Sequence, residues 1–151
     1  MTAFGRVGLM ALLVAATSGG ASAQTGRLVE LTGNDLMKYS VTAVAAKPGE
    51  LLHVRLKNVG TLPKVAMAHN FVLLAKGTDA AAFANASATA YANGYIDPAM
   101  KAKVLASTPT AGPGETVEVT FKAPAAPGVY TFLCSFPGHF LSGMKGTLTV
   151  K

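Results

Sequence analysis

Apolar and polar residues alternate along several short runs of this chain, and Gly, Pro and Asn separate the runs. In residues 51–57, Leu52, Val54 and Leu56 occupy every second position, and polar residues fill the positions between them. The same alternation recurs in residues 116–122 and 147–150. Successive side chains of a strand point to opposite faces, so each run presents one face to a core and the other to water. We therefore predict an all-β fold.

One interval departs from this pattern, since residues 78–92 are rich in alanine and contain no Pro or Gly. This composition favours a short helix, which Thr78 or Asp79 can cap at its start and which Asn93-Gly94 can end. Short strands, turn residues and a single helical interval predict one antiparallel Greek-key β-sandwich, with one short inserted helix near 78–92.

The first residues are typical of a secretory signal peptide. Arg6 precedes an apolar stretch, and residues 1–23 close on the small residues Ala21-Ser22-Ala23, which suit signal peptidase. A membrane-spanning helix is the alternative, but polar residues and glycines interrupt the stretch, and a span needs about 20 mostly apolar residues. We predict cleavage after Ala23, one mature domain of residues 24–151, and export to the periplasm.

The charge of the chain narrows the choice of partners. The formal net charge is +6, and removal of Arg6 with the signal peptide leaves +5. The Lys and Arg residues are scattered singly rather than clustered along a phosphate-binding track, so nucleic acid is not an expected partner. No segment after Gln24 has the length of a membrane span. We expect a soluble monomer whose mild positive charge biases its encounters with protein partners.

Cys134 is the only cysteine of the chain. Thiols in an oxidising compartment are normally paired in disulfides, so a single cysteine indicates burial, a reactive role or a metal bond. Cys134, His139 and Met144 follow one another in a Cys-x4-His-x4-Met pattern that leads into the last run of the chain. These donors suit copper, and a second imidazole completes a trigonal His₂Cys site with a weak axial methionine. His69, which precedes the largely apolar residues 70–74 (NFVLL), is the natural supplier of this imidazole, held at the start of a strand.

Zinc is the main competing metal, because it also binds cysteine and histidine. Structural zinc sites, however, prefer several cysteines or closely spaced Cys and His pairs, so the methionine in the pattern favours one copper ion. His53 shares the outward face of its run with Arg55 and Lys57, and we interpret it as a solvated histidine rather than a ligand.

Several segments resemble azurin sequences, and the resemblance extends across nearly the whole mature chain. These segments are 33–39 (GNDLMKY), 62–64 (LPK), 67–73 (MAHNFVL), 134–139 (CSFPGH) and 144–149 (MKGTLT). The chain thus resembles the azurin branch of the cupredoxins, which are blue-copper electron carriers. This resemblance implies that His69, Cys134 and His139 are equatorial ligands and that Met144 is axial, with the Ala68 carbonyl opposite it at long range.

Two features depart from azurins. One extra residue separates His139 from Met144, and this spacing resembles auracyanins, the azurin-like copper proteins of certain photosynthetic bacteria. The disulfide typical of azurins cannot form, because Cys134 has no second cysteine to pair with. Stability is therefore expected from the core and the metal.

The resemblance also implies roles for residues around the ligands. The side chain of Asn70 is expected to tie the His69 segment to Ser135, and backbone amides near Asn70 and Phe136 are expected to hydrogen-bond the Cys134 sulfur. An apolar docking patch is expected around an exposed edge of the second histidine ligand. The residues of this patch are Leu36, Met67, Pro137, Phe140 and Leu141.

The expected function is one-electron shuttling between redox proteins such as cytochromes, reductases or oxidases, without enzymatic activity. A copper-delivery or copper-buffering protein with the same ligands is the alternative. A hydrolase with Cys134 as nucleophile and His139 as base lacks an orienting carboxylate and a Gly-rich oxyanion loop nearby. Three histidines cannot furnish a trinuclear copper cluster as well, and one cysteine cannot form a dinuclear copper-A centre.

Overall fold

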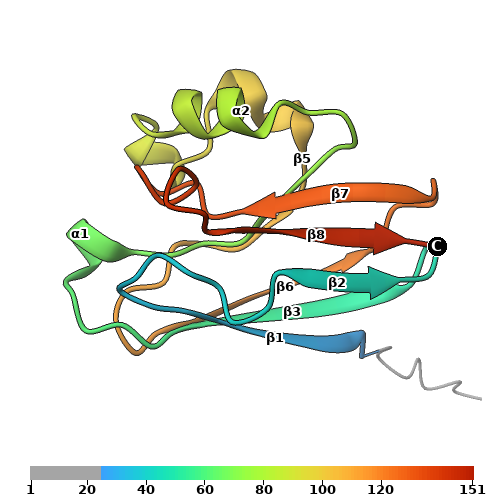
Figure 1. The fold of residues 1–151 in the computed structure, drawn as a ribbon, viewed down its shortest axis with the longest axis horizontal. Helices are drawn as coiled ribbons and strands as arrows, with labels where there is room; N and C mark the ends of the chain where they lie inside the picture. Colours follow the sequence, from blue (N-terminus) through green and yellow to red (C-terminus); the bar gives the residue numbers. More distant parts are fainter. Residues whose placement is uncertain (1–24) are drawn as a thin grey trace, which may run out of the picture.

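Two β-sheets face each other in the computed structural model, which describes residues 25–151 (Figure 1). The three-stranded sheet has the order β1 (Arg27–Gly33), β3 (Leu51–Asn58), β6 (Thr116–Lys122). The five-stranded sheet has the order β2 (Ala43–Ala46), β8 (Lys145–Val150), β7 (Gly128–Leu133), β4 (Val72–Leu74), β5 (Val104–Ser107). The expected all-β sandwich is therefore confirmed, whereas the predicted signal peptide lies outside the described residues.

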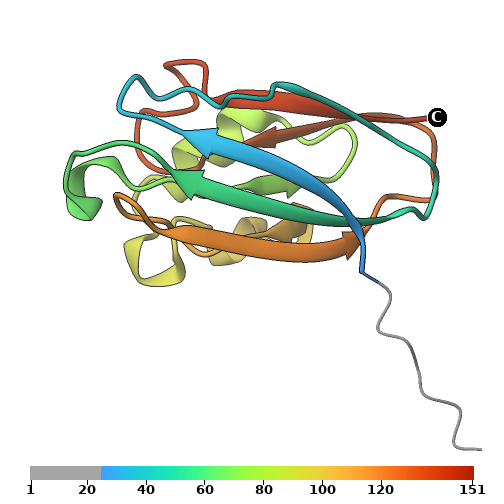
Figure 2. The same cartoon turned by 90° about the horizontal axis from the view of Figure 1, so that it is seen from below.

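The pairing of the strands differs from the prediction in one respect. Four strand pairs are antiparallel, but β1 pairs with β3 in parallel, and so does β2 with β8. The expectation of a wholly antiparallel sandwich was therefore wrong. Between β1 and β3 the chain passes through β2 in the opposite sheet, so it returns to the first sheet in its original direction. Figure 2 shows β1, β3 and β6 side by side in the three-stranded layer.

Helical segments connect the strands mainly on one side of the five-stranded sheet (Figure 1). They are α1 (Lys64–Met67), α2 (Ala80–Ser87) and the 3₁₀ segments η1 (Tyr91–Asn93) and η2 (Pro98–Lys103). Asp79 caps α2 as expected, since its side chain accepts hydrogen bonds from the backbone amides of Ala81 and Ala82. The α-helix ends at Ser87, earlier than predicted. The buried Ser87 hydroxyl accepts a bond from the Asp97 amide, and the chain turns there into 3₁₀ geometry. Among residues 25–151, no helix is long and apolar enough to cross a membrane.

The core lies between the two sheets and follows the alternation of the sequence. Leu52, Val54 and Leu56 are at most 2% exposed, which confirms the predicted inward face of β3. A second cluster lies beneath α2, where Phe83 packs with residues of β4 and with Leu133. The β4 residues are all buried, because this strand carries core on both of its faces. A continuous apolar run is typical of such a strand.

His53 lies outside the core, on the opposite face of β3. Its Nδ1 is 2.7 Å from the Thr120 hydroxyl and its Nε2 is 3.2 Å from a Glu118 carboxylate oxygen. The ring is therefore a partly exposed member of a polar cross-strand cluster, and it takes no part in the group of potential metal ligands.

The loops that carry the predicted ligands meet at one end of the sandwich. The loop after β1, the segment around α1 and the loop between β7 and β8 all lie at the left of Figures 1 and 2. This arrangement follows from strand direction, because β1, β3 and β7 all end there and β8 begins there. The rigid sheets thus position the site described next.

Candidate metal centre

The three side chains predicted as equatorial ligands meet in the interior of the protein. The Nδ1 atoms of His69 and His139 lie 3.2 Å apart, and the Cys134 Sγ lies 3.4 Å from the His139 Nδ1. The possible ligand atoms of all three residues lie within 4.8 Å of one another, and all three residues are buried. Metal–nitrogen bonds of about 2.0 Å and metal–sulfur bonds of about 2.3 Å can bridge such gaps. One ion can therefore contact all three atoms.

The backbone of His69 is fixed by a partner far along the chain. His69 and Ala111 form an isolated β-bridge with two backbone hydrogen bonds of 3.0 and 2.7 Å. The sequence predicted a strand starting at His69, whereas β4 begins at Val72. His69 therefore lies ahead of the strand, and pairing with the segment at Ala111 replaces the strand ladder as its support.

Backbone hydrogen bonds in the loop between β7 and β8 hold the other predicted ligands together. The Cys134 amide donates to the Met144 carbonyl at 3.1 Å, and the Met144 amide donates to the His139 carbonyl at 2.9 Å. The His139 amide donates to the Phe136 carbonyl at 3.1 Å. Gly138 adopts a φ of +80°, which glycine tolerates without steric cost, so the loop can turn tightly before the histidine.

Gly33, the last residue of β1, lies against both Met144 and His69. A Cβ atom at this position would be 2.8 Å from the Met144 Cε and 2.7 Å from the His69 Cδ2. Only glycine therefore leaves room for both side chains in their present positions. Since Met144 is fully buried, its thioether group lies in the interior beside the His69 ring. Gly33 was not among the predicted site residues, although a glycine in a strand often marks the close approach of other groups.

Asn70 connects the two segments that carry the predicted ligands. Its Nδ2 donates to the Ser135 hydroxyl at 2.9 Å, and the Ser135 amide donates to the Asn70 Oδ1 at 2.9 Å. Both residues are buried, and the Tyr39 hydroxyl donates to the Asn70 carbonyl. The backbone amides of Asn70 and Phe136 hydrogen-bond the Cys134 sulfur. The resemblance to azurins implied the contact between Asn70 and Ser135 and the amide bonds to the sulfur, whereas the bond from Tyr39 was not predicted.

Asn58 also supports the segment around His69, and it was not among the predicted site residues. Its Nδ2 donates to the Met67 carbonyl at 3.1 Å and to the Ala111 carbonyl at 3.0 Å. Asn58 is fully buried and occupies the next inward-facing position of β3 after Leu56. A polar residue at an inward position of a strand requires a hydrogen-bond partner, and this was the available signal.

The family of the chain follows from its match to a protein-family model. The model described as "Copper binding proteins, plastocyanin/azurin family" matches residues 27–151. The chain belongs to the plastocyanin/azurin family. Copper is therefore the cofactor expected of this family member, and the buried group of one cysteine and two histidines offers suitable donors.

Individual family members show the same relationship. Azurin from Alcaligenes faecalis is 37% identical over 123 residues, covering 80% of this chain and 94% of that azurin. Auracyanin-B from Chloroflexus aurantiacus is 37% identical over 117 residues, covering 77% of this chain and 48%, about half, of auracyanin-B. The crystal structure of a dithionite-reduced auracyanin from Roseiflexus castenholzii is similar with a TM-score of 0.73 and 32% identity, covering 82% and 96% of the two chains. The resemblance to both azurins and auracyanins is confirmed.

Burial determines the protonation of the donor groups in the metal-free protein. It raises the pKa of the Cys134 thiol to about 12, against the opposing effect of two backbone amides. Burial, and then the neighbouring His69, lower the pKa of His139 to about 4. Burial also lowers the pKa of His69, with the Asn34 backbone and the Asp35 carboxylate opposing it. At neutral pH the centre therefore holds a thiol and two uncharged imidazoles, and uncharged imidazole is the form that binds metals.

These pKa shifts predict that the metal-free protein loses stability in acid. Histidines in the unfolded chain bind protons below about pH 6.5, whereas folded His139 stays neutral until about pH 4. The unfolded state therefore binds more protons in this window, and the free energy of unfolding falls as pH falls. Thermal melts of copper-free protein should show this decline, and a His139→Gln variant should show less of it. A melting temperature that stays constant from pH 6.5 to pH 4 would contradict the prediction.

The predicted docking patch is only partly exposed. Leu36 and Leu141 are 75% and 76% exposed, and Pro137 is exposed as well. Phe140 is half-buried, because it packs against the cluster beneath α2. Met67, at the end of α1, is also half-buried. Val65 of α1, which is not among the predicted patch residues, is more exposed than either leucine, at 83%.

His139 itself does not present an exposed edge, and that expectation was wrong. The residue is 1% exposed, and its ring centroid lies 4.8 Å from that of Phe136 and 5.0 Å from that of His69. The neighbouring rings and the loop cover the imidazole. Any electron that reaches His139 from a partner must therefore cross a layer of protein atoms.

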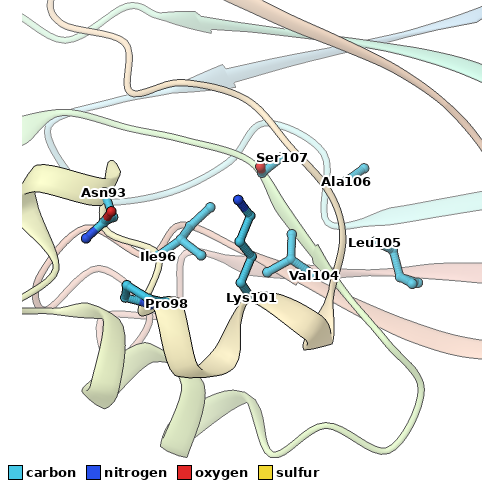
Figure 3. Close-up of a pocket in the computed structure, with 8 residues that line it drawn as sticks. All are labelled: Asn93, Ile96, Pro98, Lys101, Val104, Leu105, Ala106 and Ser107. Atoms are coloured by element: carbon cyan, nitrogen blue, oxygen red, sulfur yellow. The ribbon is translucent and has the colours of Figure 1, made fainter.

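A surface hollow of about 530 Å³ lies away from the predicted ligands (Figure 3). Lys101 extends between Ile96 and Val104 in this view. The residues that line the hollow are Asn93, Ile96, Pro98, Lys101, Val104, Leu105, Ala106 and Ser107. The lining contains no cysteine, histidine or methionine, so the candidate metal centre lies in the interior and not in this hollow.

Proposed function

We propose that this family member binds one copper ion through His69, Cys134, His139 and Met144 and shuttles single electrons between redox proteins. The convergence of the cysteine sulfur and two imidazole nitrogens in a buried site is the observation that carries this proposal. A trigonal His₂Cys set with a weak axial methionine is the donor set of blue-copper electron-transfer sites. The long-range carbonyl contact is assigned to Ala68, which directly precedes the first ligand.

The surroundings of the donors suit electron transfer. When bound, copper supplies the one-electron couple between Cu(I) and Cu(II). The chain holds the donors in place through the Asn70–Ser135 hydrogen bonds and the backbone bonds of the ligand loop. Such support fixes the orientation of ligands and limits their movement when the oxidation state changes. Since His69, Cys134 and His139 are all at most 1% exposed, no substrate can reach the metal directly, which favours a carrier over an enzyme.

Absorption spectroscopy of copper-loaded protein tests this function. We expect an intense blue band from charge transfer between the Cys134 sulfur and Cu(II), which disappears on reduction and returns on reoxidation. A copper-delivery or copper-buffering protein would instead release its metal readily to a chelator. Colourless copper-loaded protein, or loss of the metal during one redox cycle, would overturn the electron-carrier proposal.

Replacement of Met144 by leucine tests the axial position. Leucine keeps the buried volume but removes the sulfur, and such exchanges usually cost less than about 1.5 kcal/mol of stability. We expect Met144→Leu to stay blue, because the three equatorial donors remain, and to raise the reduction potential, because a donor to Cu(II) is lost. Redox titration measures the shift. Met100→Leu, made beside the cluster beneath α2, is the matched control and should leave the potential unchanged. Equal potentials in both variants would exclude Met144 as a ligand.

We also propose that the chain is exported to the periplasm with cleavage after Ala23, leaving residues 24–151 as one soluble copper domain. The arrangement of Arg6, an apolar stretch and small residues supports this processing. Cytochromes, reductases or oxidases are suitable partners, because they exchange single electrons. Mass spectrometry of the protein from a periplasmic extract should give an N-terminus at Gln24. An intact residue 1 in that fraction would contradict the proposed cleavage.

A further inference from the structure

Four rings form a continuous series from the metal centre to the surface. The centroid of His139 lies 4.8 Å from that of Phe136, and Phe136 lies 4.8 Å from Tyr95. Tyr95 in turn lies 5.9 Å from Tyr91. His139 and Phe136 are 1% and 7% exposed, whereas Tyr91 is 74% exposed. The series therefore begins at a proposed copper ligand and ends in solvent.

The backbone at Tyr95, which carries the third ring of this series, has an unfavourable conformation. Tyr95 has a φ of +61°, in the left-handed region that costs free energy for any residue with a side chain. Its amide donates to the Ala90 carbonyl at 2.9 Å, and the Asn70 Nδ2 donates to the preceding Gly94 carbonyl at 3.3 Å. The turn that carries Tyr95 is thus anchored to the residue that follows the first proposed ligand.

Packing against the core between the sheets accounts for the position of Tyr95, but not for that of Tyr91. Tyr91 buries little of its side chain, and a glycine at position 95 would adopt the same backbone conformation at lower cost. A surface hollow of about 410 Å³ opens where the series ends, and Tyr91, Tyr95 and Val65 all contribute to its lining. A redox group of a partner can therefore approach the last two rings without touching the ligand loop, which does not line this hollow.

We propose that the series His139–Phe136–Tyr95–Tyr91 is a second electron-transfer route, which serves an acidic one-electron haem or copper protein docked over Tyr91. The inference rests on the proposed copper site. The net charge of +5 for residues 24–151 favours an acidic partner. In each transfer Cu(I) loses one electron and becomes Cu(II), and the partner gains that electron. The rings bridge the gap by tunnelling, so they remain neutral and no proton moves.

Intramolecular electron transfer to an attached photo-oxidant tests this route. A ruthenium complex is attached through Ala92→Cys, next to Tyr91, and in a second protein through Leu141→Cys on the ligand loop. Both positions are exposed, whereas Cys134 is buried and is a proposed copper ligand, so it is protected from the label. Flash photolysis then gives the rate at which Cu(I) reduces the oxidised label. The blue band and the reduction potential are measured for every variant, so that rates are compared at equal driving force.

Tyr95→Leu removes one ring of the series, and Tyr95→Phe keeps it. We expect Tyr95→Leu to slow transfer to the label at residue 92 about tenfold and to change the rate at residue 141 less than about twofold. Tyr95→Phe should retain the parent rate at both labels. Equal rates at residue 92 in Tyr95→Leu and the parent would overturn the route, and so would an equal loss in Tyr95→Phe. A colourless or irreversibly reduced parent would instead refute the proposed copper function itself.

Discussion

A Cys134→Ser variant is expected to lose the intense blue absorption and most of its affinity for copper. The hydroxyl of serine is nearly the same size as the thiol, but it is a hard donor that cannot replace soft thiolate sulfur. Loss of a residue that only supports a ligand typically lowers metal affinity by about 10- to 100-fold. The loss of affinity in Cys134→Ser should be larger than this. Absorption spectra and copper titrations of the two proteins give both quantities.

The fold of this variant is expected to persist. Cys134 is buried at the end of β7, where its amide bonds to the Met144 carbonyl, and the substitution leaves that backbone bond intact. Circular dichroism of the copper-free proteins should therefore agree. Ser142→Ala, in the same loop but outside the donor set, is the control and should stay blue. A blue Cys134→Ser protein would overturn the ligand assignment.

Asn70→Ala is expected to destabilise the metal-free protein by about 2–4 kcal/mol, because it leaves the buried Ser135 amide and hydroxyl without partners. Copper affinity should also fall, by about 10- to 100-fold, since the segments of His69 and Cys134 are no longer tied together. Urea unfolding of the copper-free protein and copper titration measure the two effects.

A matched substitution distinguishes the effect of losing the hydrogen bonds between Asn70 and Ser135 from the effect of replacing any asparagine by alanine. Asn85 is exposed on α2, and Asn85→Ala should change stability by less than about 0.5 kcal/mol. Copper affinity should not change in this control. Equal stability of the Asn70 and Asn85 variants would show that the hydrogen bonds to Ser135 do not hold the two segments together.

Much of the fold could be predicted because alternation is a local property. Leu52, Val54 and Leu56 face the core as their spacing requires, and Asp79 caps the helix that follows it. The parallel pairing of β1 with β3 could not be predicted in this way. No residue pattern within β1 or β3 specifies whether the two strands pair in parallel or antiparallel. Their relative direction depends on the passage of the chain through the other sheet.

The candidate site, like the fold, could be predicted only where its residues lie close together in the sequence. Cys134, His139 and Met144 belong to one loop, so their spacing in the sequence was enough to predict that they lie close together. The type of each donor indicated copper. The sequence by itself thus determined the sandwich, the chemistry of the donor set and the resemblance to azurins and auracyanins. These properties depend on residue type, on short-range spacing and on the repeat of the strand.

The tertiary structure alone decided which distant residues complete and surround the site. It placed His69 next to a loop 70 residues away, and it revealed Gly33 and Asn58 as neighbours. It also buried His139 and placed the ring of Tyr95 next to that of Phe136. Such contacts join segments with no local relation in sequence. Their geometry depends on strand order, on loop closure and on the packing of all side chains at once, which no short pattern contains.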